Sequence, residues 1–250
     1  MRLAGLIPVA IMVIAAAATS HGQNAVPGTS PDQSARTSAP IDITGYWVSQ
    51  IVDEFRHRVA PQKGDLTFVP LNMDGTRIAK AWNPDAKENE CKAYGAVGLL
   101  QRPGRLHITW SDENTLRIDA DAGTQTRFLH FVGDATVARP TLQGYSAARW
   151  EMSGGGGRGR GGAVEKRGSL AVVTTKMTPG YIRKNGVPHS ANARLTEYFA
   201  LLAGPGGQVY LIDTATVDDP SYLTAPFIRS YIFKKLPDAS GWEPTPCWPK

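Results

Sequence analysis

A histidine in a turn-forming segment is the strongest candidate for chemistry in this sequence. His189 lies in Asn-Gly-Val-Pro-His-Ser (185–190), directly before a predicted strand. A histidine that a loop positions titrates near neutral pH and can act as a general acid or base. Glu197 follows on that strand and would meet the histidine if the chain folds back. The alternative is a histidine that hydrogen-bonds the backbone and fixes the loop.

A second polar group lies on three predicted neighbouring strands and comprises His107, Arg117, Asp119 and Arg127. If these side chains face inward, they form a network that can bind an anionic group, and His107 with Asp119 becomes a second acid–base pair. If they face outward, they form an ion-pair ladder across the surface. The sequence leaves open which face of the strands over 105–131 is inward.

Aromatic and polar side chains supply the candidates for ligand binding. On the predicted strand 145–152, Tyr145, Arg149 and Glu151 share a polar face that either lines the barrel or lies outside it. The apolar face is more often inward in such barrels, which favours the outside for Arg149 and Glu151. Tyr181 lies in a segment that could form a mouth over the barrel. The predicted ligand-binding side chains are Arg127, Tyr145, Arg149, Trp150, Tyr181 and Tyr198.

Several classes of site lack their sequence signals. The five histidines show no metal-ligand spacing, and the chain has no phosphate-binding loop, dinucleotide fingerprint or nucleophile elbow. We therefore expect no metal and no cofactor. The formal net charge is +5, but much of it falls in a Gly/Arg-rich segment, so the nearly neutral body predicts no nucleic-acid groove.

The elements that position these residues are predicted to be strands. From residue 105 onward, short segments alternate apolar and polar residues, with turn residues between them at regular spacing. This pattern is typical of all-β proteins. A further strand is expected over 42–49, and short helices over 73–82 and 85–94. We predict an antiparallel, lipocalin-like barrel of about nine or ten strands, because closure removes exposed sheet edges.

The barrel is predicted to follow two N-terminal segments. Residues 1–23 combine Arg2, an uncharged apolar run and small polar residues, which is typical of a cleavable signal peptide; an uncleaved anchor is the alternative. Residues 24–40 are rich in Ser, Thr, Pro, Gly and Gln and are expected to be a flexible leader. A single barrel domain is expected over 41–250, with a Gly/Arg-rich loop inserted into a hairpin at 153–168. The predicted location is periplasmic or secreted, without a stable membrane anchor.

The chain has two cysteines, Cys91 and Cys247. An even number of cysteines in an exported chain predicts a disulfide. Such a bond would close a very long loop and would tie the C-terminus to the segment before the first long strand. The alternative is two unrelated buried thiols.

Several short motifs resemble, in the same order, those of a broad family of secreted proteobacterial and acidobacterial proteins whose activity is not settled. They cover roughly residues 85–236 and are Gly144-Tyr145-Ser146, Arg149-Trp150-Glu151, Leu170-Ala171-Val172-Val173, Pro188-His189-Ser190, Thr196-Glu197, Val217-Asp218-Asp219-Pro220 and Pro226-Phe227. In that family the Arg-Trp-Glu strand turns through Gly-Asp directly into the apolar strand, whereas here the Gly/Arg-rich insertion replaces the turn. The resemblance implies a secreted barrel and names no reaction.

Three functions follow as expectations. The first is a barrel that binds a small apolar or aromatic molecule in its interior. The second is a cofactor-free lyase, isomerase or hydrolase that uses His189 with a carboxylate. The third is a structural envelope protein whose barrel is packed throughout. The sequence does not indicate the oligomeric state.

Overall fold

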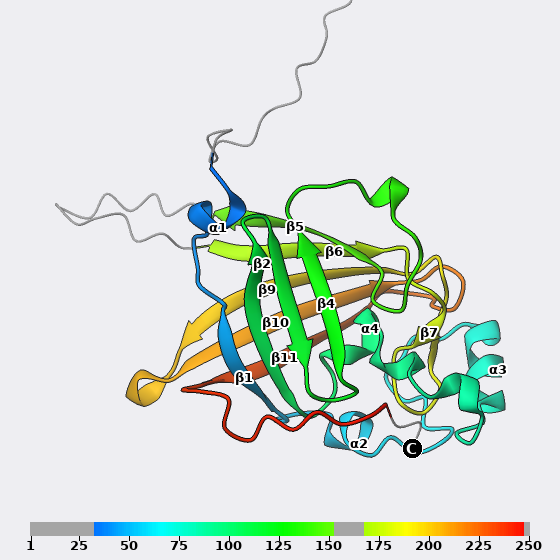
Figure 1. Cartoon of the computed structure of the whole chain (residues 1–250). Coiled ribbons are helices and arrows are strands. Elements are labelled where there is room, and N and C mark those ends of the chain that lie inside the picture. The colour runs from blue at the N-terminus through cyan, green and yellow to red at the C-terminus, as the bar shows by residue number, and fades with distance from the viewer. Residues whose placement is uncertain (1–32, 153–167, 248–250) are drawn as a thin grey trace, which may run out of the picture.

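Nine strands close into a single barrel in the computed structural model, which describes residues 33–152 and 168–247 (Figure 1). The order around the barrel is β1-β11-β10-β9-β6-β5-β4-β3-β2, and β2 pairs with β1 to complete it. This confirms the predicted all-β barrel. The strands are β1 (Gly45–Gln50), β2 (Arg105–Asp112), β3 (Thr115–Ala120), β4 (Gln125–His130), β5 (Tyr145–Met152), β6 (Gly168–Thr175), β9 (Arg194–Ala203), β10 (Val209–Asp218) and β11 (Phe227–Leu236).

One pair of strands is parallel. The other barrel pairs are antiparallel, but β4 and β5 run in the same direction, with Leu129 opposite Ser146. The expectation of a wholly antiparallel barrel is therefore wrong at this pair. A parallel pair needs a crossover connection, and residues 131–144 supply it, including the 3-10 helix η3 (Ala135–Val137). Gly144 ends this connection at φ +63°, where an added Cβ would lie 2.4 Å from the Thr175 carbonyl oxygen.

Alternation along the strands fills the barrel with side chains. In β10, for example, Leu211, Asp213, Ala215 and Val217 are buried, whereas the residues between them are partly exposed. Each fully buried Leu, Ile or Phe stabilises the fold by roughly 1.5–3 kcal/mol. The inward residues of all nine strands form one core together with the side chains of an adjoining short helix.

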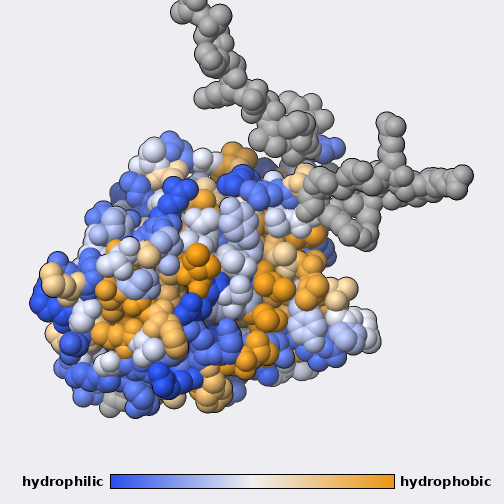
Figure 2. Space-filling view, turned by 180° about the vertical axis from the view of Figure 1, so that it is seen from behind, coloured by the Kyte–Doolittle hydropathy of each residue, from blue (hydrophilic) through white to orange (hydrophobic). Residues whose placement is uncertain are grey.

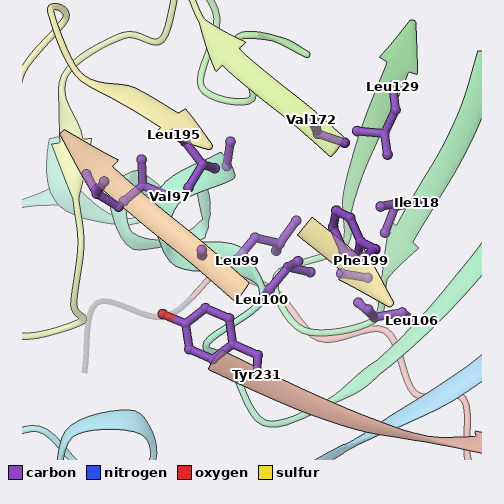
Figure 3. Close-up of a cluster of buried hydrophobic side chains, with 14 of the residues drawn as sticks. Val97, Leu99, Leu100, Leu106, Ile118, Leu129, Val172, Leu195, Phe199 and Tyr231 are labelled. Atoms are coloured by element: carbon purple, nitrogen blue, oxygen red, sulfur yellow. The ribbon is translucent and has the colours of Figure 1, made fainter. Parts of the chain in front are cut away.

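Most of the short helices gather at one end of the barrel, which we call the helical end (Figure 1). Leu99 and Leu100 from this end point towards strand residues such as Tyr231 and Phe199 (Figure 3). The predicted helix over 73–82 is confirmed, and Asn72 caps it by accepting from the Gly75 amide at 2.9 Å. The elements here are α2 (Phe55–Arg58), α3 (Met73–Ala81), η1 (Lys87–Asn89), η2 (Lys92–Tyr94), α4 (Ala96–Leu99), β7 (Gly180–Tyr181) and β8 (Pro188–His189).

A disulfide joins Cys91 to Cys247 at the helical end, as predicted, with the two Cα atoms 5.0 Å apart. It attaches the C-terminal segment to the start of η2. Such a bond is compatible with an oxidising compartment. Within the described residues, none of the helices has the length and apolar character needed to cross a membrane.

The opposite end of the barrel, which we call the mouth, is covered by the N-terminal segment (Figure 1). Part of the predicted flexible leader is ordered there, because residues Ala35–Ser38 form the helix α1 and the Ser34 side chain accepts from the Thr37 amide. The signal peptide predicted over 1–23 lies outside the described residues. So does the Gly/Arg-rich insertion, except for Gly168, which begins β6. The last short helix is η4 (Pro205–Gly207), between β9 and β10.

Candidate functional site

A buried ion pair crosses the middle of the barrel. The Arg127 guanidinium on β4 binds both carboxylate oxygens of Glu197 on β9, with 2.8 Å between Nη1 and Oε1. Ser146 accepts from Arg127 Nε at 3.2 Å, and Thr174 accepts from Nη2 at 2.8 Å. Burial alone would lower the pKa of Arg127, but the adjacent Glu197 charge raises it above its ordinary value. Every guanidinium nitrogen has a partner, so the pair is a fully satisfied structural contact.

Asp213 lies on β10, directly across from Phe199 on β9, and is fully buried. Neither of its carboxyl oxygens has a hydrogen-bond partner among the described residues. Burial raises the pKa of Asp213 well above its usual range, and the negative charge of Glu197 adds to this shift. The folded protein therefore favours the neutral, protonated form of the Asp213 carboxyl. The sequence carried a signal for this residue, a lone acid at an inward position between Leu211 and Ala215, but alternation alone did not single it out.

A pocket of about 390 Å³ opens at the mouth of the barrel. Its aromatic wall belongs to a cluster in which the ring centroids of Trp110 and Phe131 are 5.7 Å apart and those of Phe131 and Trp150 are 5.1 Å apart. Trp150 is the one predicted ligand-binding residue in its lining. The lining residues are Arg36, Ala39, Pro40, Ile41, Asp42, Ile43, Thr44, Trp110, Leu116 and Trp150.

The N-terminal segment forms the other wall of this pocket and is held by hydrogen bonds to Trp150 and to the turn between β2 and β3. Trp150 Nε1 donates to the Ala35 carbonyl oxygen at 2.7 Å. The Ala35 amide donates to Asn114 Oδ1 at 2.9 Å, and the Arg36 amide donates to the Glu113 carbonyl oxygen at 3.1 Å. The last two acceptors lie in the turn between β2 and β3. A tryptophan of the pocket thus also anchors the segment that encloses it.

His189 lies at the helical end and is fully buried. Its Nδ1 is 3.1 Å from the Ser190 carbonyl oxygen, which can only accept, so the neutral ring carries its proton on Nδ1. Burial lowers the pKa of His189, although the Ser190 carbonyl and Asp219 oppose the shift, and the ring is neutral at pH 7. Glu197 binds Arg127 inside the barrel instead of His189. The observed contact is that of a histidine fixing the backbone.

His107 and Asp119 face each other across β2 and β3 on the outside of the barrel. The His107 ring stacks on Tyr46, with centroids 4.0 Å apart. Asp119 pairs with Arg117 at 2.8 Å, and the Arg117 side chain is 46% exposed. The surface ion-pair alternative therefore describes Arg117 and Asp119, whereas Arg127 points inward. The predicted four-residue interior network is not formed.

Three predicted ligand-binding residues lie on the outer wall. Arg149 pairs with Glu151 at 2.6 Å on an exposed face, as the apolar-inward expectation required. The ring of Tyr145 stacks on His130 with centroids 4.9 Å apart, and Tyr198 is 40% exposed. Seen from behind, the surface mixes hydrophilic and hydrophobic groups (Figure 2). None of these three side chains lines the mouth pocket.

Tyr181 belongs to the helical end, far from the pocket. Its hydroxyl donates to Asn89 Oδ1 at 2.8 Å, and the Lys92 ammonium lies 5.8 Å from its ring centroid. It packs against the small cluster around the disulfide. The expected mouth over the barrel at 181–185 is therefore part of the packed helical end. In the described ranges, no group of three or more His, Cys, Asp or Glu side chains could hold a metal ion.

Comparisons with protein-family models, with curated proteins and with solved structures find no match to this chain.

Proposed function

We propose that this chain is an exported barrel protein that binds a small aromatic or apolar molecule at the mouth of the barrel. The observation that carries the proposal is the pocket of about 390 Å³ with Trp110 and Trp150 in its lining. Pockets for small molecules commonly have volumes of roughly 300–1,000 Å³ and combine apolar or aromatic walls with a few polar groups. Flat ligands stack favourably on such rings.

The proposed site differs in place from the interior site predicted from sequence. The middle of the barrel is occupied by packed side chains and by the Arg127–Glu197 pair. Space for a ligand lies instead between the mouth of the barrel and the N-terminal segment, where Arg36, Asp42 and Thr44 add polar groups to the lining. These groups would orient a ligand that has an apolar body and one polar substituent. The disulfide supports an exported location.

The two other functions predicted from sequence have less support. The acid–base enzyme relied on His189 with Glu197, and these side chains engage different partners. Its second pair, His107 with Asp119, lies on the outer wall. A purely structural protein would have no use for a pocket lined by two tryptophans. We therefore favour the binding protein over both.

A fluorescence titration tests the proposal with N-phenyl-1-naphthylamine, an uncharged aromatic dye that brightens in apolar surroundings. The wild-type protein should bind the dye, and Trp150→Leu and Trp110→Leu should each raise the Kd by about tenfold, which corresponds to about 1.4 kcal/mol. The matched control is Trp242→Leu, because Trp242 packs beside Tyr46 and His107, away from the pocket lining. Far-UV circular dichroism should show that all variants are folded. Absence of dye binding by the wild type, or an equal loss in the control, would refute the proposal.

A further inference from the structure

Three arginines are buried together at the helical end. Arg58 on α2 is 2% exposed, Arg102 after α4 is 3% exposed, and Arg183 between β7 and β8 is 1% exposed. Arginine is almost never fully buried unless its guanidinium group is paired. Removing such a charge from water costs several kcal/mol unless partners replace the water. The role of the cluster can therefore be inferred from the hydrogen-bond and ion-pair partners of these three side chains.

Gln101 connects the members of the cluster. Its carbonyl oxygen accepts from Arg58 Nε at 3.2 Å, and its own side-chain amide donates to the Ile182 carbonyl oxygen at 2.8 Å, next to Arg183. Arg102 directly follows Gln101 in the chain. The Arg58 guanidinium also lies 5.1 Å from the ring centroid of Tyr231. A backbone carbonyl and a ring thus hold Arg58, and Arg183 Nη1 donates to the Thr67 carbonyl oxygen at 2.8 Å.

Four terminal nitrogens of the cluster have no hydrogen-bond partner within residues 33–152 and 168–247. They are Nη2 of Arg58, Nη1 and Nη2 of Arg102, and Nη2 of Arg183. Arg102 keeps a single bond, from Nε to the Gly98 carbonyl oxygen at 3.2 Å. An unpaired N–H in a buried position costs about 1–3 kcal/mol, and more when the group is charged.

Carboxylates balance this charge only in part, and they act on Arg58 and Arg183. Asp53 lies 3.5 Å from Arg58 but is 54% exposed, and Glu54 is 3.8 Å from Arg183 while it binds Arg229 at 2.7 Å. For Arg102 the described part of the chain contains no carboxylate within 4.0 Å. Burial lowers the pKa of Arg102 to about 10; Tyr94 and Tyr231 oppose this shift, and the charges of Arg58 and Arg183 add to it. Even so, the group is cationic at pH 7.

We propose that Arg58, Arg102 and Arg183 form a binding site for an oxyanion, namely a phosphate, a sulfate or the carboxylate of a small molecule. The planar guanidinium fork matches the oxygens of these groups and can bind them through two parallel hydrogen bonds. An oxyanion would accept from the terminal nitrogens that lack partners and would supply the missing negative charge. The ammonium of Lys184, which lies 6.0 Å from the ring centroid of Tyr94, adds a further cation near Arg102.

This inference does not depend on the mouth pocket. The arginine cluster lies at the helical end, whereas the pocket lies beside α1 at the opposite end (Figure 1). None of the three arginines lines that pocket. Loss of dye binding and loss of anion binding are therefore separable results.

Thermal unfolding in low-salt buffer tests the proposal with sodium phosphate, sodium sulfate and sodium acetate, each compared with sodium chloride of equal ionic strength. An anion at 100 times its Kd should raise the Tm of the wild type by roughly 5 °C or more. Arg102→Met should abolish this shift. In chloride alone its Tm should be no lower than that of the wild type, because an apolar side chain replaces a buried, unpaired charge. The matched control is Arg77→Met on α3 at the same end, because Arg77 is 71% exposed, and it should shift as the wild type does.

Each outcome decides for or against the site. A shift with phosphate and sulfate alone assigns a tetrahedral anion, and a shift with acetate assigns a carboxylate. A wild-type Tm that no anion raises above the chloride value overturns the proposal, and so does an Arg102→Met protein that shifts as much as the wild type. If Arg102→Met does not fold, Arg102→Lys replaces it, because lysine keeps the charge and lacks the fork. Calorimetric titration of that variant with the same salts should show at least a tenfold weaker Kd, and an unchanged Kd overturns the site.

Discussion

Arg127, buried in the middle of the barrel, and Arg102, one of the three arginines buried at the helical end, are partnered in opposite ways. In the middle, each guanidinium nitrogen of Arg127 donates to Glu197, Ser146 or Thr174. At the helical end, both terminal nitrogens of Arg102 lack a partner among the described residues. The side chains are almost equally buried. Burial of a charge therefore does not by itself indicate its role in this protein.

The two arginines differ in whether their guanidinium nitrogens still lack hydrogen-bond partners. Each guanidinium nitrogen of Arg127 already has a hydrogen-bond partner, and the contact with Glu197 connects β4 to β9. Arg102 retains its fork of donors, and the protein holds that fork in place through the backbone at Gly98. A satisfied cluster rigidifies a core, whereas an unsatisfied one is costly unless another group fills it. We expect mutations in the two clusters to behave accordingly.

The largest effect should come from the disulfide that anchors the helical end. Replacing Cys91 and Cys247 by Ser should lower the free energy of unfolding by about 4 kcal/mol, because the bond closes a very long loop. Urea unfolding of the oxidised wild type and of the double variant measures this difference. Mass spectrometry of non-reduced peptides from periplasmic material should recover the linked pair. Two free thiols there, or a loss below about 1 kcal/mol, would contradict the assignment.

Breaking the ion pair in the middle should have the next largest effect. Glu197→Gln leaves the Arg127 charge uncompensated in the core, and we expect a loss of about 3 kcal/mol in the free energy of unfolding. The control is Glu151→Gln, which breaks the exposed pair with Arg149 and should cost less than about 1 kcal/mol. Equal losses in the two variants would mean that Arg127 is compensated in another way. Arg102→Met should show no loss in the free energy of unfolding, in contrast to Glu197→Gln.

The smallest effect concerns Asp213 and depends on pH. Because the folded protein raises the pKa of Asp213 above its ordinary value, the folded state holds more protons than the unfolded state above about pH 4. The free energy of unfolding should therefore fall by about 1.4 kcal/mol per pH unit until the folded pKa is reached. Asp213→Asn should remove this component, and Asp119→Asn on the outer wall should retain it. Urea unfolding at pH 5 and pH 7 compares them, and identical slopes for wild type and Asp213→Asn would disprove a raised pKa.

The fold was largely predictable because strand periodicity is a local property. Leu106 and Ile108 alternate with polar residues, and the structure buries both. The face of β4 was not predictable in this way. Arg127 points inward at 1% exposure, whereas its neighbour Phe128 is 41% exposed. Arg127 can occupy this inward position because Glu197 on the distant strand β9 pairs with it. No local sequence pattern encodes that contact.

The candidate sites depended even more on distant contacts. Trp150 was recognisable as an inward aromatic residue, but the second wall of its pocket comes from the predicted leader. The arginines at the helical end carry no periodic signal, because they belong to short irregular segments that meet only in the folded protein. His189 was predicted to be a general acid or base because of its residue type. In the structure it is buried and contacts the Ser190 carbonyl oxygen, which fixes the backbone.

The position of β1 also bears on how the chain reaches this structure. β1 lies between β2 and β11, so the first barrel strand of the sequence pairs with the last. Without β1 the other eight strands would be an open sheet whose edges are β2 and β11, and such edges can recruit a second chain. Contacts between the ends of a chain also form slowly, because the entropy of closing the intervening loop opposes them. By pairing with both of these edges, β1 protects the barrel from edge-to-edge association.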